Sequence, residues 1–325
     1  MDGLDGTGAV PVIDIAPLRA AAAADDPGRA AGVAAAMRRA CAGTGFFYIT
    51  GHGVAPAAVA HIFAEAKRFF ALPTEIKLRI PIEANRGYEG IGRQSLDAAT
   101  GADFKESVMI GDDALDADHP AIRAGVPMCA PNKWPDDLPG WRASVVGHFA
   151  TMDRLAMLLL KGLALSLELP WGFFEGQFDP SMSSLRLLHY PPHPDADPAR
   201  AVGCGAHTDW GLITLLAQDQ VGGLQIQLRS GEWIDAKPMP GAFIVNIGDM
   251  MARWSNDLYT STPHRVLNRS PHDRYSVVFF CDPAHHTRVE CLPSCTGPDR
   301  PPRYVPTTCG EHLAEMYRRS YGTAA

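Results

Sequence analysis

A histidine and an aspartate stand two residues apart in the short run at 206–210, as His207 and Asp209. If this run is a β-strand, both side chains project from the same face, because successive side chains of a strand alternate between faces. An imidazole and a carboxylate side by side can supply two ligands to a divalent metal ion. Such a pair is also common on surfaces and at helix caps, so a third ligand is needed.

The third ligand is found in a strand-like run at 262–266, which contains His264. Two histidines and one carboxylate on one side of a metal leave neighbouring coordination positions open. Iron(II) enzymes use such positions for a co-substrate and dioxygen. Zinc hydrolases also bind their metal through two histidines and a carboxylate, so the three ligands alone leave the metal undecided.

An arginine and a serine follow at Arg274 and Ser276, again two residues apart in a run typical of a strand. A guanidinium fork and a hydroxyl on one face form a receptor for a carboxylate. A zinc peptidase could also use such a receptor. However, the order His-x-Asp, His, Arg-x-Ser along one chain is a specific combination, and it favours the iron enzyme.

The chain resembles the 2-oxoglutarate and iron(II)-dependent oxygenase superfamily, in its isopenicillin N synthase-like branch. The resemblance covers nearly the whole chain and implies that His207, Asp209 and His264 bind Fe(2+) and carry the catalysis. The following segments carry it: VPVIDIAPL (10–18), GFFYITGHGV (45–54), DFKESVMIG (103–111), NKWP (132–135), LRLLHYPP (185–192), HTDWGLITLLAQDQVGGLQIQ (207–227), STPHRVLN (261–268) and DRYSVVFFCDP (273–283).

The resemblance also implies a binding site for the co-substrate 2-oxoglutarate. Arg274 and Ser276 would hold its distal carboxylate, and Tyr190 matches a tyrosine that touches the co-substrate in many relatives. One departure concerns Tyr190: plant relatives often carry asparagine two residues earlier, where this chain has Leu188. A core aromatic residue is therefore the alternative interpretation of Tyr190.

Three further residues near these motifs carry expectations. Asn246 and Leu215, on neighbouring core strands, are candidates to flank the co-substrate. Trp210 follows the His-x-Asp pair and is expected on the opposite face, packed in the core.

The implied function is a dioxygenase that uses Fe(2+), 2-oxoglutarate and O2 to oxidise a small-molecule metabolite. Hydroxylation, desaturation or cyclisation would accompany release of succinate and carbon dioxide. Two alternatives stay open: an iron(II) oxidase of the same fold that does not use 2-oxoglutarate, and a non-catalytic metal-binding member. The prime substrate and product type are undetermined. Arg93, in the loop at 84–104, is a candidate partner for a substrate carboxylate, although a plain surface arginine is the simpler interpretation.

These motifs require a β core to position them. Patterning predicts a mainly β protein with α elements: a double-stranded β-helix (jelly roll) flanked by N-terminal helices and a long spine helix. We expect one domain over 1–325, with a mostly helical layer at 1–180, the jelly-roll catalytic core at 181–285 and a loop and helix at 286–325. The expected elements are strands at 12–15 and 45–50, helices at 26–41, 56–70 and 140–169, β runs at 185–190, 205–218, 224–228, 233–236, 242–247, 262–267 and 274–281, and a helix to Tyr321 opened by a capping box of Thr308 and Glu311.

Composition limits the partners of the protein. The 325 residues carry a formal net charge of −7 and show no basic patch for phosphates, so no nucleic-acid partner is expected. The first residues are acidic, unlike a secretory leader, and the apolar run at 155–169 is short for a membrane span. Seven cysteines without paired spacing suit free thiols. We expect a cytoplasmic protein, a monomer or weak homodimer, that binds no membrane.

Overall fold

The computed structural model describes residues 10–97, 99–192 and 202–321. The acidic residues before Val10, which bear on the expected absence of a leader, lie outside this part. The strands are β1 (Val12–Asp14), β2 (Phe46–Thr50), β3 (Gly87–Glu89), β4 (Glu106–Gly111), β5 (Ser184–Tyr190), β6 (Val202–His207), β7 (Ile213–Gln218), β8 (Leu224–Gln227), β9 (Trp233–Asp235), β10 (Phe243–Ile247), β11 (His264–Leu267), β12 (Arg274–Cys281), β13 (Arg288–Val289) and β14 (Thr307–Thr308). The α-helices are α1 (Ala16–Ala24), α2 (Ala31–Ala42), α3 (Pro56–Phe70), α4 (Thr74–Lys77), α5 (Pro120–Arg123), α6 (Trp141–Ser166), α7 (Asp249–Trp254) and α8 (Cys309–Tyr321).

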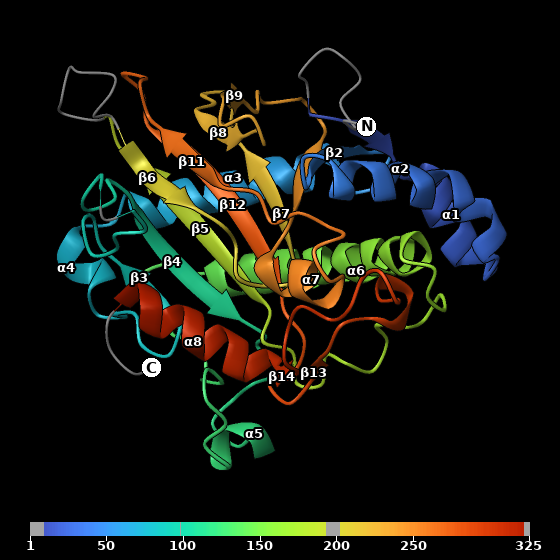
Figure 1. The fold of residues 1–325 in the computed structure, drawn as a ribbon. Helices are drawn as coiled ribbons and strands as arrows, with labels where there is room; N and C mark the ends of the chain where they lie inside the picture. The colour runs from blue at the N-terminus through green and yellow to red at the C-terminus, as the bar shows by residue number, and fades with distance from the viewer. Residues whose placement is uncertain (1–9, 98, 193–201, 322–325) are drawn as a thin grey trace.

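Two β-sheets form the centre of the molecule (Figure 1). The larger has the strand order β1-β2-β10-β7-β12-β5-β4-β3, and the smaller has the order β6-β11-β8-β9. Apolar side chains from both sheets pack into one shared cluster, which includes Phe46, Leu188 and Leu216 from the larger sheet and Ile226 and Val266 from the smaller. The sheets therefore face each other across a common core, and within the described residues they do not join into a closed barrel.

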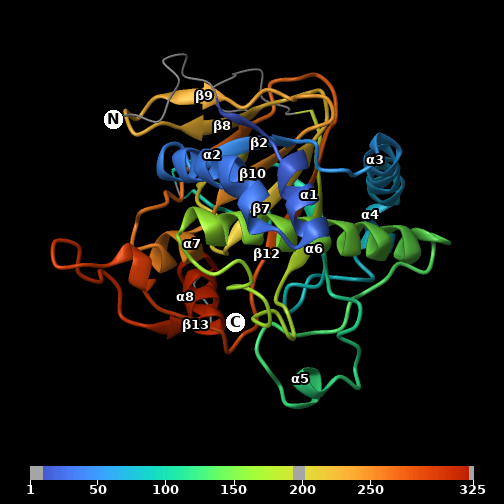
Figure 2. The same ribbon diagram turned by 90° about the vertical axis from the view of Figure 1, so that its right-hand side faces the viewer.

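Helices cover the other face of the larger sheet. In Figure 2, α1, α2 and α6 lie together in front of β7, β10 and β12. The spine helix α6 is 26 residues long, and its Leu155, Leu159 and Leu163 are buried at helical spacing against this layer. By length and mean hydropathy, α6 is the one described helix that could cross a membrane. It is longer than the apolar run at 155–169, because it begins well before that run. It is packed against α2, α3 and β12 inside the fold.

The structure departs from the expected elements near the N-terminus. Helix α1 is absent from the expected elements, which place only a strand at 12–15 before the helix at 26–41. Proline suits the first turn of a helix, where its missing N–H needs no partner, and Pro17 occupies that place in α1. The helix expected from Asp26 is divided into a 3-10 turn (Pro27–Ala30) and α2. Asp26 does cap the turn, since its carboxylate accepts a hydrogen bond from the Gly28 N–H at 3.2 Å.

The β run expected at 205–218 is also divided, into β6 of the smaller sheet and β7 of the larger. Residues 208–212 connect the two sheets, so the expectation of one continuous strand was wrong. The capping box of the last helix is confirmed. The Glu311 N–H donates to Thr308 Oγ1 at 3.2 Å, and the Thr308 N–H donates to Glu311 Oε2 at 2.9 Å.

A buried histidine on α6 is expected to make the fold sensitive to acid. His148 is 6% exposed, and its Nε2 has no hydrogen-bond partner among the described residues. Burial lowers the pKa of His148 to about 4. Between its ordinary pKa of about 6.5 and this value, the unfolded chain binds a proton that the folded chain does not. Stability is therefore lost as pH falls through this window, by at most about 3 kcal/mol at about 1.4 kcal/mol per pH unit.

Replacing His148 with leucine should flatten the fall in unfolding free energy between pH 7 and pH 4.5, measured by chemical denaturation. Burial raises the pKa of Asp282 to about 7, and this shift has the opposite effect on the slope, so only the difference from wild type isolates His148. His286→Leu is the control, because His286 is exposed. Equal pH slopes for wild type and His148→Leu would contradict the prediction.

Candidate metal centre and adjoining cavities

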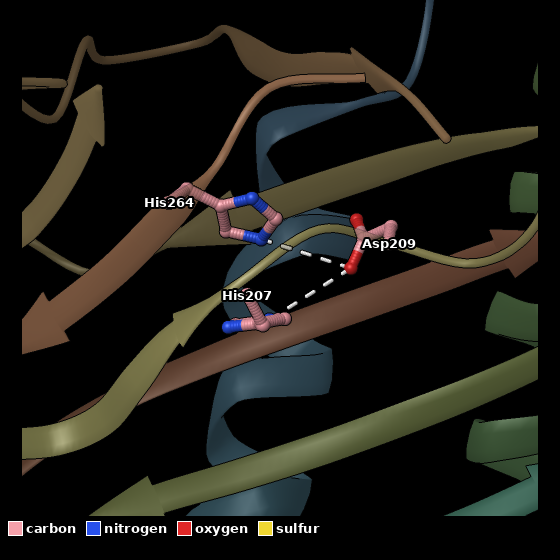
Figure 3. Close-up of side chains that lie close together, drawn as sticks. All are labelled: His207, Asp209 and His264. Carbon is pink, nitrogen blue, oxygen red and sulfur yellow. Dashed lines mark ion pairs between the residues drawn. The ribbon is translucent and has the colours of Figure 1, made fainter. Parts of the chain in front are cut away.

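The three expected metal ligands come together where the smaller sheet meets the connection to β7. His207 ends β6 and His264 begins β11, and these two residues are direct partners across the antiparallel pair. The His207 and His264 Nε2 atoms lie 3.9 and 3.7 Å from Asp209 Oδ1. Figure 3 shows the three side chains pointing toward one another, and their ligand atoms all lie within 4.8 Å.

Asp209 reaches this point by a route that strand alternation does not describe. It lies two residues beyond the end of β6, in the connection at 208–212. The expectation that His207 and Asp209 share a strand face was therefore wrong in its geometry. The turn of the backbone as it leaves the smaller sheet brings the carboxylate within 4 Å of both imidazoles.

Backbone carbonyl groups orient both imidazoles. His207 Nδ1 lies 2.8 Å from the Gly205 carbonyl oxygen, and His264 Nδ1 lies 3.2 Å from that of Thr262. A proton on each Nδ1 then leaves the Nε2 lone pair directed at Asp209. Burial lowers the pKa of both histidines, that of His264 to about 4. Both rings are therefore neutral near pH 7, the state that a metal requires.

Two side chains of the larger sheet hold the carboxylate of Asp209. Its Oδ2 accepts hydrogen bonds from Thr214 Oγ1 at 2.6 Å and from Asn246 Nδ2 at 2.7 Å. Burial raises the pKa of Asp209, but the two nearby imidazoles and these hydrogen bonds outweigh it, so the pKa falls below its ordinary value. Oδ1 stays directed at the imidazoles. Asn246, expected beside the co-substrate, thus contacts the candidate metal ligand Asp209. The matching role of Thr214 is not among the sequence-based expectations.

A cavity of about 80 Å³ adjoins the three ligands between the two sheets. Arg274 lines it and is fully buried, with its guanidinium 4.6 Å above the Tyr190 ring. Arg274 Nε donates to the Gly222 carbonyl at 2.5 Å, and Nη1 lies 3.5 Å from Ser276 Oγ. The other nitrogen, Nη2, has no hydrogen-bond partner within the described chain. The residues expected to bind the metal (His207, Asp209 and His264) and those expected to hold the co-substrate (Tyr190, Arg274 and Ser276) therefore line the same cavity.

The unpartnered nitrogen of Arg274 indicates what this cavity accepts. A buried guanidinium without a carboxylate is energetically costly, and polar groups in protein interiors almost always have partners. A carboxylate entering the cavity would receive hydrogen bonds from Nη2 and from the Ser276 hydroxyl. The cavity therefore suits an acid that extends from Arg274 to the metal ligands, and zinc peptidase chemistry is not needed to explain the arginine. Leu215, the other expected neighbour of the co-substrate, is buried in the core on the helix side instead.

A second cavity of about 100 Å³ shares His207 and Asp209 with the first. The loop at 84–104 does line it, but not through Arg93, which is exposed and lies outside its lining. Arg86 contributes instead, together with Glu89 and Gln94. The sequence alone could not show which of the two arginines in this loop, Arg86 or Arg93, lines the cavity.

Trp210 lies at the wall of this second cavity. It is partly buried against the core, as expected, but it also lines the cavity and makes an edge-to-face contact with Tyr317, with ring centroids 4.7 Å apart. Helix α8, which carries Tyr317, therefore closes one side of the space beside the metal ligands.

Comparisons with known proteins agree with this site. The model of the 2OG-Fe(II) oxygenase superfamily matches residues 181–283, and that of the N-terminal region of non-haem dioxygenases in morphine synthesis matches 10–137. A 2-oxoglutarate-Fe(II) type oxidoreductase of Emericella nidulans is 38% identical, over 97% of this chain and 91% of its own. A homoarginine-6-hydroxylase of Oryza sativa subsp. japonica is 36% identical, over 94% and 96%. The crystal structure of full-length Neurospora crassa T7H with alpha-KG and thymine superposes with a TM-score of 0.84 at 31% identity, over 99% of both chains.

Proposed function

Because the chain belongs to the 2-oxoglutarate and iron(II)-dependent oxygenase superfamily, we propose that its His207, Asp209 and His264 bind the catalytic iron. The protein is a non-haem dioxygenase with a jelly-roll core. It uses Fe(2+), 2-oxoglutarate and O2 to oxidise a small molecule. In this proposal Arg274 and Ser276 bind the distal carboxylate of 2-oxoglutarate, with the Tyr190 ring beneath the guanidinium.

One observation carries the co-substrate assignment: the unpartnered Nη2 of a fully buried Arg274 in the cavity of the three candidate ligands. An iron(II) oxidase that does not use 2-oxoglutarate would have to offer this cation the carboxylate of its own substrate, so succinate formation must separate the two. A non-catalytic member would not need the carboxylate receptor and the three ligands together.

The side chains have separable tasks in this proposal. When bound, the iron and 2-oxoglutarate supply oxidising power through dioxygen activation, with release of succinate and carbon dioxide. Asp209 and the two histidines fix the metal in a neutral-imidazole, ionised-carboxylate environment. Arg274 neutralises the far end of the acid. Apolar walls between the sheets, such as Leu188 and Val266, exclude water.

An anaerobic titration with Fe(II) and 2-oxoglutarate tests the assignment, followed by succinate measurement with candidate metabolites under air. We expect 2-oxoglutarate to bind tightly only in the presence of the metal. Succinate should then form above the background that the protein produces without a metabolite. Oxidation of a metabolite without succinate would instead identify an oxidase that does not use 2-oxoglutarate.

Removing the hydrogen bonds to Asp209 should weaken metal binding without unfolding the protein. Asn246→Ala and Thr214→Val each delete one donor to Asp209 Oδ2 and free the carboxylate to rotate. Residues that orient metal ligands typically contribute about 10- to 100-fold in affinity, and we expect losses in this range by Mn(II) or Fe(II) titration. Thr151→Val on α6 is the matched control. Unchanged affinity in both variants would show that Asp209 does not depend on these partners.

We further propose that one oxygenase domain spans 1–325 and acts in the cytoplasm as a monomer or weak homodimer, without nucleic-acid or membrane partners. The net charge of −7 and the packing of the apolar α6 within the fold support this. Light scattering after size exclusion tests the oligomeric state. The relatives differ in the small molecules that they act on or bind, homoarginine for the rice hydroxylase and thymine for Neurospora crassa T7H, so neither is assigned to this chain.

A further inference from the structure

The second cavity contains a buried cation for which the chemistry of iron and 2-oxoglutarate has no use. Arg86, the residue before β3, lines this cavity with His207 and Asp209 and is 2% exposed. Its Nη1 donates to the Asn85 carbonyl at 2.9 Å, while its Nε has no partner in the described part of the chain. No described carboxylate lies within ion-pair distance of the guanidinium.

The other buried cations show how unusual this is. Five lysine or arginine side chains are buried among the described residues: Lys77, Arg86, Lys105, Arg186 and Arg274. Three have carboxylate partners, in the pairs Lys77–Glu106 at 2.6 Å, Lys105–Asp103 at 2.7 Å and Arg186–Glu89 at 2.5 Å. The remaining two line cavities beside the candidate metal ligands: the cavity of Arg274 includes all three ligands, and that of Arg86 includes His207 and Asp209. If Arg274 binds one acid, Arg86 is available for another.

Contacts with neighbouring segments fix the position of the Arg86 backbone and side chain. A tight turn pairs the backbone of Arg86 with that of Glu83 through two hydrogen bonds of 2.9 Å, and the carboxylate of Glu83 is bound to Lys133. The guanidinium lies directly on the backbone of Gly111 at the end of β4, where an added Cβ would come within 2.0 Å of Nη2. Asn132 holds that glycine through both its N–H and its carbonyl, at 2.7 and 3.0 Å.

We propose that Arg86 binds a carboxylate of the prime substrate, and that the enzyme therefore oxidises a small carboxylic acid. This inference rests on the proposed function, because the substrate must lie beside the iron. A planar guanidinium edge matches a carboxylate through parallel hydrogen bonds. Among the described residues that line the cavity, Arg86 is the only arginine without a carboxylate partner, so a phosphate group would lack the further cations that it usually requires. Methionines such as Met109, Met128 and Met182 line the same space and suit an apolar body.

Charge in the rest of the cavity is consistent with a single anionic group. Glu89 is neutralised by Arg186, and Asp209 faces the metal site. The third carboxyl group of the lining, Asp282, accepts a hydrogen bond from the Leu212 N–H at 3.2 Å, and burial raises its pKa to about 7. Burial also lowers the pKa of Arg86 below its ordinary value, which shows how poorly its surroundings support an isolated charge. A bound carboxylate would offset this loss of solvation.

Matched pairs of acids and primary amides test the proposal: hexanoate and hexanamide, benzoate and benzamide, phenylacetate and phenylacetamide. Binding is measured by calorimetry on the anaerobic protein loaded with Fe(II) and saturating 2-oxoglutarate. We expect at least one acid to bind 10-fold or more tightly than its amide. Arg86→Gln should reduce this preference to less than 2-fold, and Arg86→Lys should keep part of it. Equal binding of acids and amides, absence of binding by every acid, or a preference that survives Arg86→Gln would overturn the proposal.

Two further variants test whether a lost preference for acids reflects the position of Arg86 or a general loss of structure. Gly111→Ala keeps the charge of Arg86 but displaces its guanidinium, and it should lose the acid preference while circular dichroism stays unchanged. Arg93→Gln removes the exposed arginine of the same loop and should keep the preference. Loss in Arg93→Gln but not in Arg86→Gln would show that the wrong arginine was chosen.

The same variants separate this inference from the proposed function. Affinity for 2-oxoglutarate should be unchanged in Arg86→Gln, because Arg274, which would bind 2-oxoglutarate, lines the first cavity and Arg86 lines the second. If wild type fails to bind 2-oxoglutarate, the proposed co-substrate site is wrong. The acid and amide comparison is therefore repeated without 2-oxoglutarate, where the effect of Arg86→Gln still decides the question for Arg86.

Discussion

Replacement of Asp209 with alanine is expected to abolish iron binding and succinate formation while the protein stays folded. Asp209 Oδ1 is the oxygen toward which both His207 Nε2 and His264 Nε2 converge, at 3.9 and 3.7 Å. Removing it leaves two imidazoles and no anionic ligand. Residues that only orient ligands already contribute about 10- to 100-fold, so loss of a ligand itself should exceed about 100-fold in metal affinity.

Thermal unfolding with and without metal distinguishes this loss from a loss of fold. A metal that binds only the folded chain raises the melting temperature, so Fe(II) or Mn(II) should stabilise wild type and leave Asp209→Ala unaffected. The metal-free variant should melt close to metal-free wild type. Both sheets bury their apolar cluster without the metal, and the variant also loses a buried carboxylate. A metal-dependent shift of equal size in both proteins would remove Asp209 from the site.

The candidate ligands could be predicted from the sequence because residue type and order carried the information. Arg274 and Ser276 lie on one strand, β12, and both are buried on the same face, as alternation predicts. The same rule failed for Asp209. The chain leaves β6 before Asp209 and crosses to the larger sheet. Where it crosses depends on pairing between strands that are distant in the sequence, which local alternation does not report.

Contacts between distant segments explain most of what the sequence did not provide. Thr214 and Asn246 lie on neighbouring strands of the larger sheet, β7 and β10, and only the pairing of these strands brings both to Asp209. Arg86 and Arg93 are chemically identical in the sequence. The pairing of β3 with β4 brings Arg86 onto the backbone of Gly111, while Arg93 stays exposed. Burial of a charge thus decides between two candidates that residue type cannot separate.

Removal of the Arg274 side chain is expected to cause the other large effect, a specific loss of affinity for 2-oxoglutarate. In Arg274→Ala, a carboxylate would enter a buried cavity without its cation. Breaking a buried charge pair in this way costs about 3 to 5 kcal/mol, which corresponds to 100-fold or more in apparent affinity. Arg274→Lys keeps the charge without the fork and should lose less. Ser276→Ala deletes one hydrogen bond, about 0.5 to 1.5 kcal/mol, and should lose roughly 10-fold or less.

The distinction between co-substrate and prime substrate makes this prediction decisive. The apparent KM for 2-oxoglutarate should rise far more in Arg274→Ala than the KM for the oxidised metabolite. Arg274 lines the first cavity, whereas Arg86, the proposed partner of the metabolite, lines the second. Arg274→Met, closer in volume, should show the same specific loss and thereby exclude collapse of the cavity as its cause. If Arg274→Ala and Arg274→Lys both turned over with unchanged dependence on 2-oxoglutarate, the guanidinium would not hold that acid. The unpartnered Nη2 would then require another ligand, and an oxidase independent of 2-oxoglutarate would become the better account of the site.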